Sequence, residues 1–298
     1  MKNRKVISIL VVLLVVAAAV ATTTGIMSEE GPGPFQHETV RGKTVTIYGK
    51  GVYQHMSAEV APQGIAQDYV TLLLGIPLLI IALLAARTGS LIARFLLAGT
   101  LGYFLVTYLF YLLMGMYNVL FLVYVFLLAT SFFAFILTLL SFDRRLLPSS
   151  FLSSTPHRLT GGFLIFQAVA IALLWLSIVV PPLLDRSIIP VQVEHYTTLV
   201  VQGLDLGLLL PAGFVAGILF FKKKPFGYLF APVYFVFLSL LMTALTAKVI
   251  AMALLGYQVI PAIFIIPVFN ILSILSGVLI LKNIGEKGNY GQTESSSS

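Results

Sequence analysis

The chain has 298 residues, of which 59% are hydrophobic and 10% are charged, and its formal net charge is +7. Soluble domains are about 45–50% apolar and about 25% charged, so this chain has too little charge to cover a surface that faces water. The composition excludes a soluble enzyme, a nucleic-acid-binding module and a disordered protein. The absence of cysteine also excludes disulfides, thiolate nucleophiles and cysteine-ligated metals.

Eight apolar segments approach or exceed the length that crosses a membrane, which is about 20 residues for a hydrocarbon core about 30 Å thick. They lie at 6–26, 68–86, 91–114, 117–141, 160–182, 197–220, 226–254 and 259–281. The sequence therefore predicts an all-α protein, a polytopic transmembrane helix bundle whose first partner is the lipid bilayer. The bundle has eight helices, or seven if the first segment is a cleaved signal.

The distribution of Lys and Arg predicts the orientation, because basic loops resist translocation. With the N-terminus in the cytoplasm, thirteen basic and three acidic residues fall on the inner side, whereas four basic and seven acidic residues fall on the outer side. We expect a multi-pass protein of the plasma (cytoplasmic) membrane with both termini cytoplasmic. The net positive charge then follows from topology and does not indicate a nucleic-acid partner.

The first segment, 1–26, has two interpretations. Basic residues from Lys2 to Lys5 precede the apolar run Val6–Val16, and Ala19-Val20-Ala21 has the small residues of a cleavage site. These features fit a cleaved signal peptide, but they also fit an uncleaved signal anchor that forms the first transmembrane helix.

The next region, 27–67, is the only sizeable polar one, and we expect it to be an extracytoplasmic loop with a β-hairpin. Alternation along Lys43–Tyr48 predicts a strand, Gly49–Gly51 a turn, and Val52-Tyr53 the start of a return strand. After it, 68–284 is expected to form seven transmembrane helices. The serine-rich stretch 285–298 is expected to be a disordered cytoplasmic tail.

The two halves of the chain suggest a 4+4 parallel repeat, a plan known in transporters. Asp68–Leu72 opens the second helix much as His195–Leu199 opens the sixth, and both helices carry a proline, Pro77 or Pro211. Chance similarity between apolar helices is the alternative.

Two ionisable residues, Asp205 and Lys248, fall inside apolar segments, where charges are costly and mark candidate functional sites. Gln202 precedes Asp205 by three positions and therefore shares its helix face. We consider all three as substrate- or ion-binding residues. Lys248 either pairs with Asp205 or extends from the outer interface, and a pair could act as a structural clamp.

The sixth helix also carries glycines at spacings that allow helices to approach closely, in the motifs Gly203-x-x-x-Gly207 and Gly213-x-x-x-Gly217. On the third helix, hydroxyl side chains share one face (Thr100, Tyr103, Thr107 and Tyr111). This stripe lines a polar path or makes hydrogen bonds between helices.

Polar residues before the second and sixth helices suggest an acidic outer vestibule for a cation or amine, with Asp68, Glu194 and His195 as its candidate residues. The alternative is ordinary polar loop ends, with acids favoured by helix dipoles. No histidine pair has metal-ligand spacing and no cofactor motif is present, so we expect neither a metal nor a cofactor.

Three stretches (Gln67–Pro77, Leu204–Gly207 and Lys224–Tyr228) resemble an uncharacterised group of prokaryotic polytopic membrane proteins. The resemblance covers most of the chain after residue 60. It implies the same topology and brings no activity with it.

These observations favour a transporter of a small solute or ion. The alternative is a membrane-embedded sensory or assembly subunit that recognises a partner membrane protein through its outer loop. An intramembrane enzyme is least expected, because no nucleophile–base pair or metal constellation is visible in the sequence.

Overall fold

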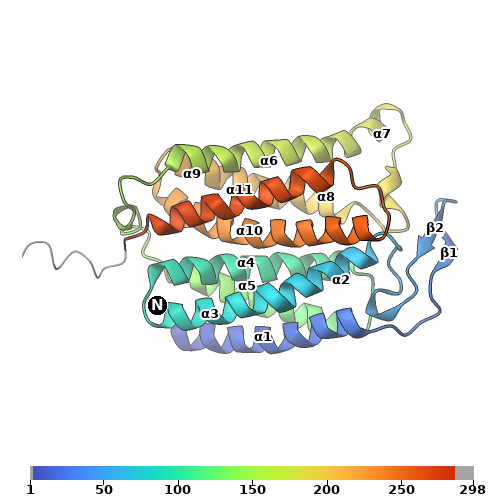
Figure 1. Cartoon of the computed structure of the whole chain (residues 1–298), viewed down its shortest axis with the longest axis horizontal. Helices are drawn as coiled ribbons and strands as arrows, with labels where there is room; N and C mark the ends of the chain where they lie inside the picture. Colours follow the sequence, from blue (N-terminus) through green and yellow to red (C-terminus); the bar gives the residue numbers. More distant parts are fainter. Residues whose placement is uncertain (1–2, 286–298) are drawn as a thin grey trace, which may run out of the picture.

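The computed structural model describes residues 3–285, and within them eight helical spans are long and apolar enough to cross a membrane. This confirms the predicted all-α transmembrane bundle, whose spans run side by side in Figure 1. The predicted tail, apart from Gly285, lies outside the described residues. The spans are α1 (Arg4–Met27), α2 with α3 (Ala61–Val70 and Ile76–Arg87), α4 (Leu91–Met114), α5 (Phe121–Leu139), α6 with α7 (His157–Val179 and Pro181–Leu184), α8 with α9 (Val200–Leu204 and Leu210–Phe221), α10 (Pro225–Leu254) and α11 (Ala262–Lys282).

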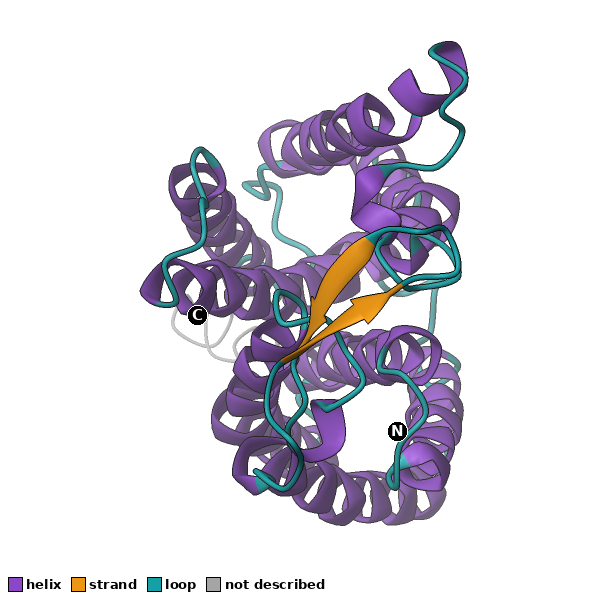
Figure 2. Ribbon diagram, turned by 90° about the vertical axis from the view of Figure 1, so that its right-hand side faces the viewer, coloured by secondary structure: helices purple, strands orange, loops and turns teal. Residues whose placement is uncertain are grey.

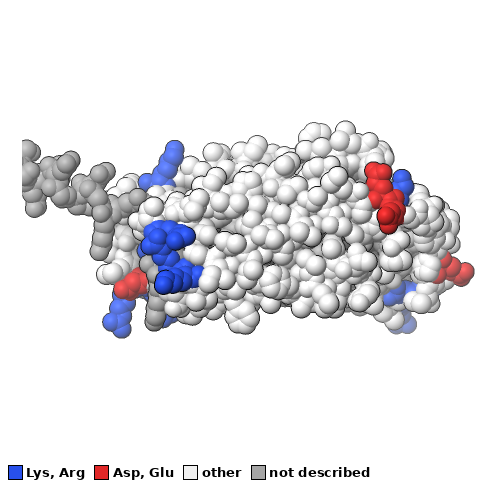
Figure 3. All heavy atoms as spheres, turned by 90° about the horizontal axis from the view of Figure 1, so that it is seen from below, with Lys and Arg blue, Asp and Glu red and all other residues white. Residues whose placement is uncertain are grey.

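Charged side chains gather at the two ends of the bundle, with an almost uncharged band between them (Figure 3). The basic end holds the start of α1 and the α3–α4 and α9–α10 turns. Among residues 3–285 it has eleven basic side chains (Arg4, Lys5, Arg87, Arg94, Arg144, Arg145, Arg158, Lys222, Lys223, Lys224 and Lys282) and one acid, Asp143. The opposite end carries the small sheet and is called the hairpin end below.

Local sequence explains the tight turns at the basic end. The Ser90 hydroxyl caps α4 by accepting a hydrogen bond from the Ala93 amide at 3.2 Å, and Gly89 before it has a φ of +103°. Pro225 opens α10 directly after the lysine turn, where its missing N–H costs nothing. Short turns of this kind keep α3 and α9 antiparallel to the helices that follow them.

The helices form two groups of four spans that lie beside each other when viewed from the hairpin end (Figure 2). In the first group α1 packs on α3 and α5, and α4 packs on α3 and α5. In the second group α9 packs on α6 and α10, and α10 packs on α11. α10 joins the groups by packing on α4 and α2.

The second span of each group has the same internal order. A five-residue π-helical segment, η2 (Thr71–Gly75) or η5 (Asp205–Leu209), leads into a twelve-residue α-helix whose second residue is Pro77 or Pro211. A proline ring crowds the carbonyl four residues before it, and the wider π turn relieves this contact. The matching order supports the duplication hypothesis and keeps the match of Pro77 with Pro211. The match of Asp68–Leu72 with His195–Leu199 differs from this register by seven residues.

The predicted hairpin exists, but its pairing is different. Strand β2 (Thr44–Ile47) falls within the predicted strand, yet it pairs antiparallel with β1 (Phe35–Glu38), which precedes it. The prediction of a return strand at Val52-Tyr53 is wrong, because these residues form the 3-10 helix η1 (Gly51–Tyr53). Burial explains the difference: Tyr53 is only 2% exposed and inserts into the bundle.

The second span begins at Ala61, seven residues before the predicted boundary at 68. Pro62 suits the first turn of a helix, and the polar residues that follow it find hydrogen-bond partners inside the bundle. The polar region between the first two spans is therefore shorter than 27–67. Asp68, expected at the helix edge, lies within the span.

Helix α1 is an integral part of the first group. Its residues Ile7, Val11, Leu14 and Ala18 are buried at spacings of three and four, which place them on one helix face. Near its end, Gly25 lies so close to the Asp68 carboxylate that a Cβ would collide with it. By packing on both α3 and α5, α1 completes the first group of four spans.

Candidate functional site

A cavity of about 620 Å³ lies inside the second group, between α6, α8, α9, α10 and α11, and extends to the hairpin end. It lies where the backbones of α6 and α11 stay apart and contact each other through side chains such as Phe166 and Phe269, whereas the corresponding helices α1 and α5 pack closely in the first group. The loop 191–199 and the start of α2 complete its mouth. The two groups thus share one helix order, and the second encloses this cavity.

Asp205 contributes a carboxylate to the cavity from the first position of η5. The indole Nε1 of Trp175, on α6, donates a hydrogen bond to Asp205 Oδ2 at 2.8 Å. Trp175 is the only tryptophan of the chain, and the sequence interpretation missed it. The indication available in the sequence was a tryptophan in the middle of an apolar segment, since a buried indole N–H needs an acceptor.

Gln202 and Lys248 line the same cavity as Asp205. Lys248, on α10, lies within electrostatic reach of both Asp205 and Asp68. Within residues 3–285, however, no ion pair of 4.0 Å or less joins it to either carboxylate. The structure thus brings the three predicted binding residues together around an open space, and the direct Asp205–Lys248 pair, one of the two alternatives left open by the sequence, is not formed.

Asp68 occupies a different place from the predicted vestibule. It is 2% exposed within the first group, where the hydroxyls of Tyr53 and Tyr111 donate to its two oxygens, the latter at 2.9 Å. Since Asp68 does not line the cavity, the expectation that it shares an outer mouth with Glu194 and His195 is wrong. The physical reason is the longer α2, which carries Asp68 below the mouth.

Tyr103, Thr107 and Tyr111 of the α4 hydroxyl stripe make hydrogen bonds to the neighbouring span, whereas Thr100 donates to the Leu96 carbonyl of its own helix. Gln67 Nε2 donates to the hydroxyls of Tyr103 at 2.8 Å and Thr107 at 3.2 Å. The Tyr103 hydroxyl also meets that of Thr71 at 2.8 Å. These bonds satisfy buried polar groups that would otherwise be costly in a membrane.

Glu194 lies at the mouth of the second-group cavity, whereas its neighbour His195 does not line the cavity and contacts the outer segment. The Arg41 guanidinium donates to the backbone carbonyls of Glu194 at 3.2 Å and Tyr196 at 3.1 Å. His195 Nε2 lies 2.9 Å from the carbonyl of His55. The outer segment is therefore attached to the loop that borders the cavity.

The mouth is acidic. Burial and the neighbouring charge of Glu194 raise the pKa of Glu59 above its ordinary value. Glu194 Oε2 is buried without a hydrogen-bond partner. A second cavity, of about 390 Å³, adjoins this region and shares Glu59, Gln63 and Lys248 with the first, while Tyr257 and Gln258 line its far side.

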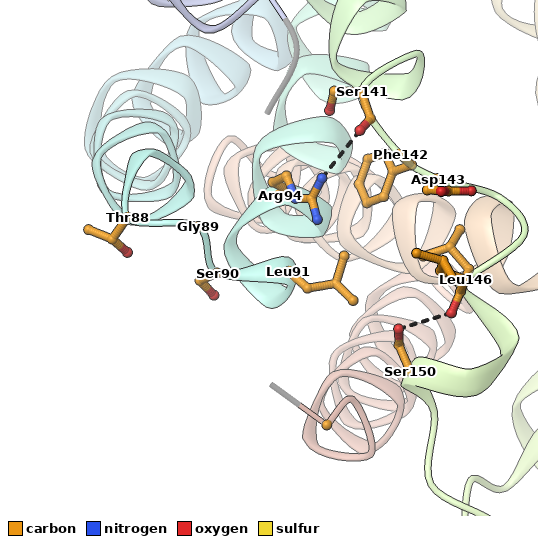
Figure 4. A pocket seen from close by; sticks show the side chains of 12 residues that line it. Thr88, Gly89, Ser90, Leu91, Arg94, Ser141, Phe142, Asp143, Leu146 and Ser150 are labelled. Carbon is orange, nitrogen blue, oxygen red and sulfur yellow. Dashed lines mark hydrogen bonds between the residues drawn. The ribbon is translucent and has the colours of Figure 1, made fainter. Parts of the chain in front are cut away.

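A separate pocket of about 460 Å³ lies at the basic end (Figure 4). There the Arg94 guanidinium points toward Ser141 and Phe142: it donates to the Ser141 carbonyl at 3.3 Å and lies 5.2 Å from the centre of the Phe142 ring. Asp143 lines the same pocket. These contacts already hold Arg94 in place, so the larger cavity is the stronger candidate site.

Across residues 3–285, no group of three or more His, Asp or Glu side chains is arranged to hold a metal ion. Comparison with protein-family models, curated proteins and solved structures found no match to this chain. Fold and site together define an integral membrane protein with a charged cavity in one of two four-span groups. Such a cavity can hold a solute that carries both polar and apolar surface.

Proposed function

We propose that the protein transports a small solute and that the second-group cavity is its binding site. The observation that carries this proposal is the placement of Asp205 and Lys248 on the wall of a cavity of about 620 Å³ within membrane-spanning helices. Ionisable groups at such depth are expensive and typically mark substrate or ion pathways. Two charges that served only as a structural clamp would be expected to contact each other directly.

The interrupted helices support the same proposal. Each group has a π-helical segment followed by a proline in its second span. Such interruptions are frequent at functional sites, and repeated units with discontinuous helices around a central site are a common transporter plan. In this proposal η5 carries Asp205 on a segment that can move relative to α9.

We further propose that the protein resides in the plasma membrane with its basic end in the cytoplasm. The excess of Lys and Arg at that end supports this orientation. The cavity then loads from the outside, through the mouth formed by the loop 191–199 and the start of α2.

Uptake into proteoliposomes tests the proposal. The purified protein is reconstituted and exposed to a panel of radiolabelled amines, amino acids and short carboxylic acids. We expect wild-type protein to accumulate at least one of them and Asp205→Asn to lose that uptake. Asp185→Asn is the matched control, because Asp185 lies in the exposed loop after α7.

Two results count against a transporter. One is wild-type protein that accumulates no member of the panel. The other is Asp205→Asn protein with undiminished uptake. If Asp205→Asn loses both uptake and its thermal unfolding transition, Asp205 has a structural role. Asp205→Glu separates this role from solute binding, because it retains the negative charge.

A sensory or assembly subunit is the second candidate, and the hairpin favours it. The β1–β2 unit extends beyond the helices (Figure 1), and Val40 in its turn is 96% exposed. A solvent-exposed apolar tip can contact a partner membrane protein. Deleting residues 35–47 should then abolish co-purification of a defined partner, and a chain that purifies alone at native expression contradicts this function.

A further inference from the structure

The charge balance of the second-group cavity indicates which solutes it accepts. Three carboxylates line it, those of Glu59, Glu194 and Asp205, against one ammonium group, that of Lys248. Lys248 lies within reach of Asp205, so it offsets the deeper carboxylate. The two glutamates at the mouth have no comparable cation in the cavity.

One of the two mouth glutamates also lacks a hydrogen bond. Glu194 Oε2 is buried and has no hydrogen-bond partner. Arg41 donates hydrogen bonds to the backbone carbonyls of the loop and makes no ion pair with the Glu194 carboxylate. A buried acceptor without a donor costs free energy, and a ligand with N–H groups would remove that cost.

The deeper wall of the cavity contains aromatic side chains beside the carboxylate. Trp175 holds Asp205 through its indole nitrogen, while Tyr234 and Phe269 line the same space. Aromatic faces attract cations and pack well against apolar groups. The wall therefore suits a ligand that combines an apolar body with a positive charge.

From this arrangement we infer that the transported solute is an organic cation, a protonated amine with an apolar body, whose ammonium group binds at Glu194 and Glu59 while its body lies against Trp175. This inference rests on the proposed function and specifies its substrate class. Anionic solutes are disfavoured because they would face three carboxylates. The ammonium group of the ligand supplies the donors that Glu194 Oε2 lacks.

Trp175 makes the test direct, because it is the only tryptophan in the chain and lines the cavity. The full-length protein in detergent is titrated with four probes of similar size: benzylammonium, benzyl alcohol, benzoate and phenylalanine. Trp175 emission reports binding of each probe. Trp175→Phe, which must abolish the emission response, verifies its source.

We expect benzylammonium to bind at least about tenfold more tightly than benzyl alcohol or benzoate, since hydrogen bonds to charged groups contribute at this scale. Glu194→Gln should lower the affinity for benzylammonium by about tenfold and leave the affinity for benzyl alcohol unchanged. Glu38→Gln, on the exposed strand β1, should leave both affinities unchanged.

Each other outcome overturns a stated part of the argument. Tighter binding of benzoate or phenylalanine than of benzylammonium rejects the cation class and leaves the cavity as a solute site. The absence of any response to benzylammonium also rejects the inference. If acrylamide in addition fails to quench Trp175, the cavity is closed to solutes and the proposed transport function fails with it.

Discussion

Replacing Gly217 with alanine should open the contact between α6 and α9 that forms one wall of the cavity. A Cβ at Gly217 would lie 2.8 Å from the Gly161 carbonyl oxygen, 2.9 Å from Leu164 Cβ and 3.0 Å from Ile165 Cγ1. The first neighbour is backbone and cannot rotate away. The two helices must therefore separate, or the substituted helix must shift along its partner.

The expected loss of stability follows from two opposing effects. Overpacking of a well-packed contact costs about 1–3 kcal/mol, and the backbone neighbour places Gly217→Ala in the upper part of that range. The better helix propensity of alanine offsets about 1 kcal/mol. We expect a net loss of about 2 kcal/mol in the free energy of unfolding.

Reversible unfolding in mixed detergent micelles, followed by Trp175 emission, measures this loss because Trp175 lies on α6. Gly203→Ala is the matched control: Gly203 belongs to the same span, and a Cβ there would have no neighbour within 4 Å. We expect the control to match or exceed wild-type stability. Equal loss of stability in both variants would contradict a close α6–α9 contact at Gly217. An unchanged free energy of unfolding for Gly217→Ala would contradict it as well.

Three further variants test the outer segment and the mouth. Tyr53→Phe removes a donor to the buried Asp68 carboxylate and should cost about 1–3 kcal/mol, measured by the same unfolding assay. Because the pKa of Glu59 is raised, the folded protein holds that proton more tightly than the unfolded chain. Stability should therefore fall as the pH rises from about 4.5 through the raised pKa, and Glu194→Gln should reduce this fall. Arg41→Gln should speed hydrogen exchange in the loop 191–199, whose carbonyls Arg41 binds.

Matched controls accompany these variants. Tyr117→Phe removes a hydroxyl from a side chain that is 78% exposed and should not change stability. Lys43→Gln removes a positive charge near Arg41 from an exposed side chain and should leave exchange in the loop unchanged. A pH profile of unfolding that Glu194→Gln does not alter would contradict the coupling between the two glutamates.

The eight spans could be predicted because their cause is simple: the thickness of a membrane sets the length of an apolar helix. The polar start of the second span could not be predicted from the sequence. Gln67 and Asp68 look like loop residues in the sequence, and their partners Tyr53, Tyr103 and Tyr111 become neighbours only in the folded bundle. Side chains far along the chain thus decided where that helix begins.

The glycine motifs illustrate the same limit. Gly203-x-x-x-Gly207 and Gly213-x-x-x-Gly217 have identical spacing, yet a Cβ at either glycine of the first pair would have no neighbour within 4 Å, whereas the second pair lies in close contact. Spacing predicts a smooth helix face, but it does not say whether that face meets a neighbouring helix. Trp175 was missed for a related reason, since its partner Asp205 is on another span.

Accessibility of Gln202 shows whether a cavity open to solutes reaches Asp205 from the hairpin end. The chain has no cysteine, so Gln202→Cys introduces a single thiol, and Leu208→Cys places one on an exposed apolar position of the same span. On intact cells, a membrane-impermeant methanethiosulfonate should modify Gln202→Cys, and a prior excess of benzylammonium should protect it, while Leu208→Cys stays unmodified in lipid. A Gln202→Cys thiol that resists the reagent on intact cells and in inverted vesicles alike would contradict the account.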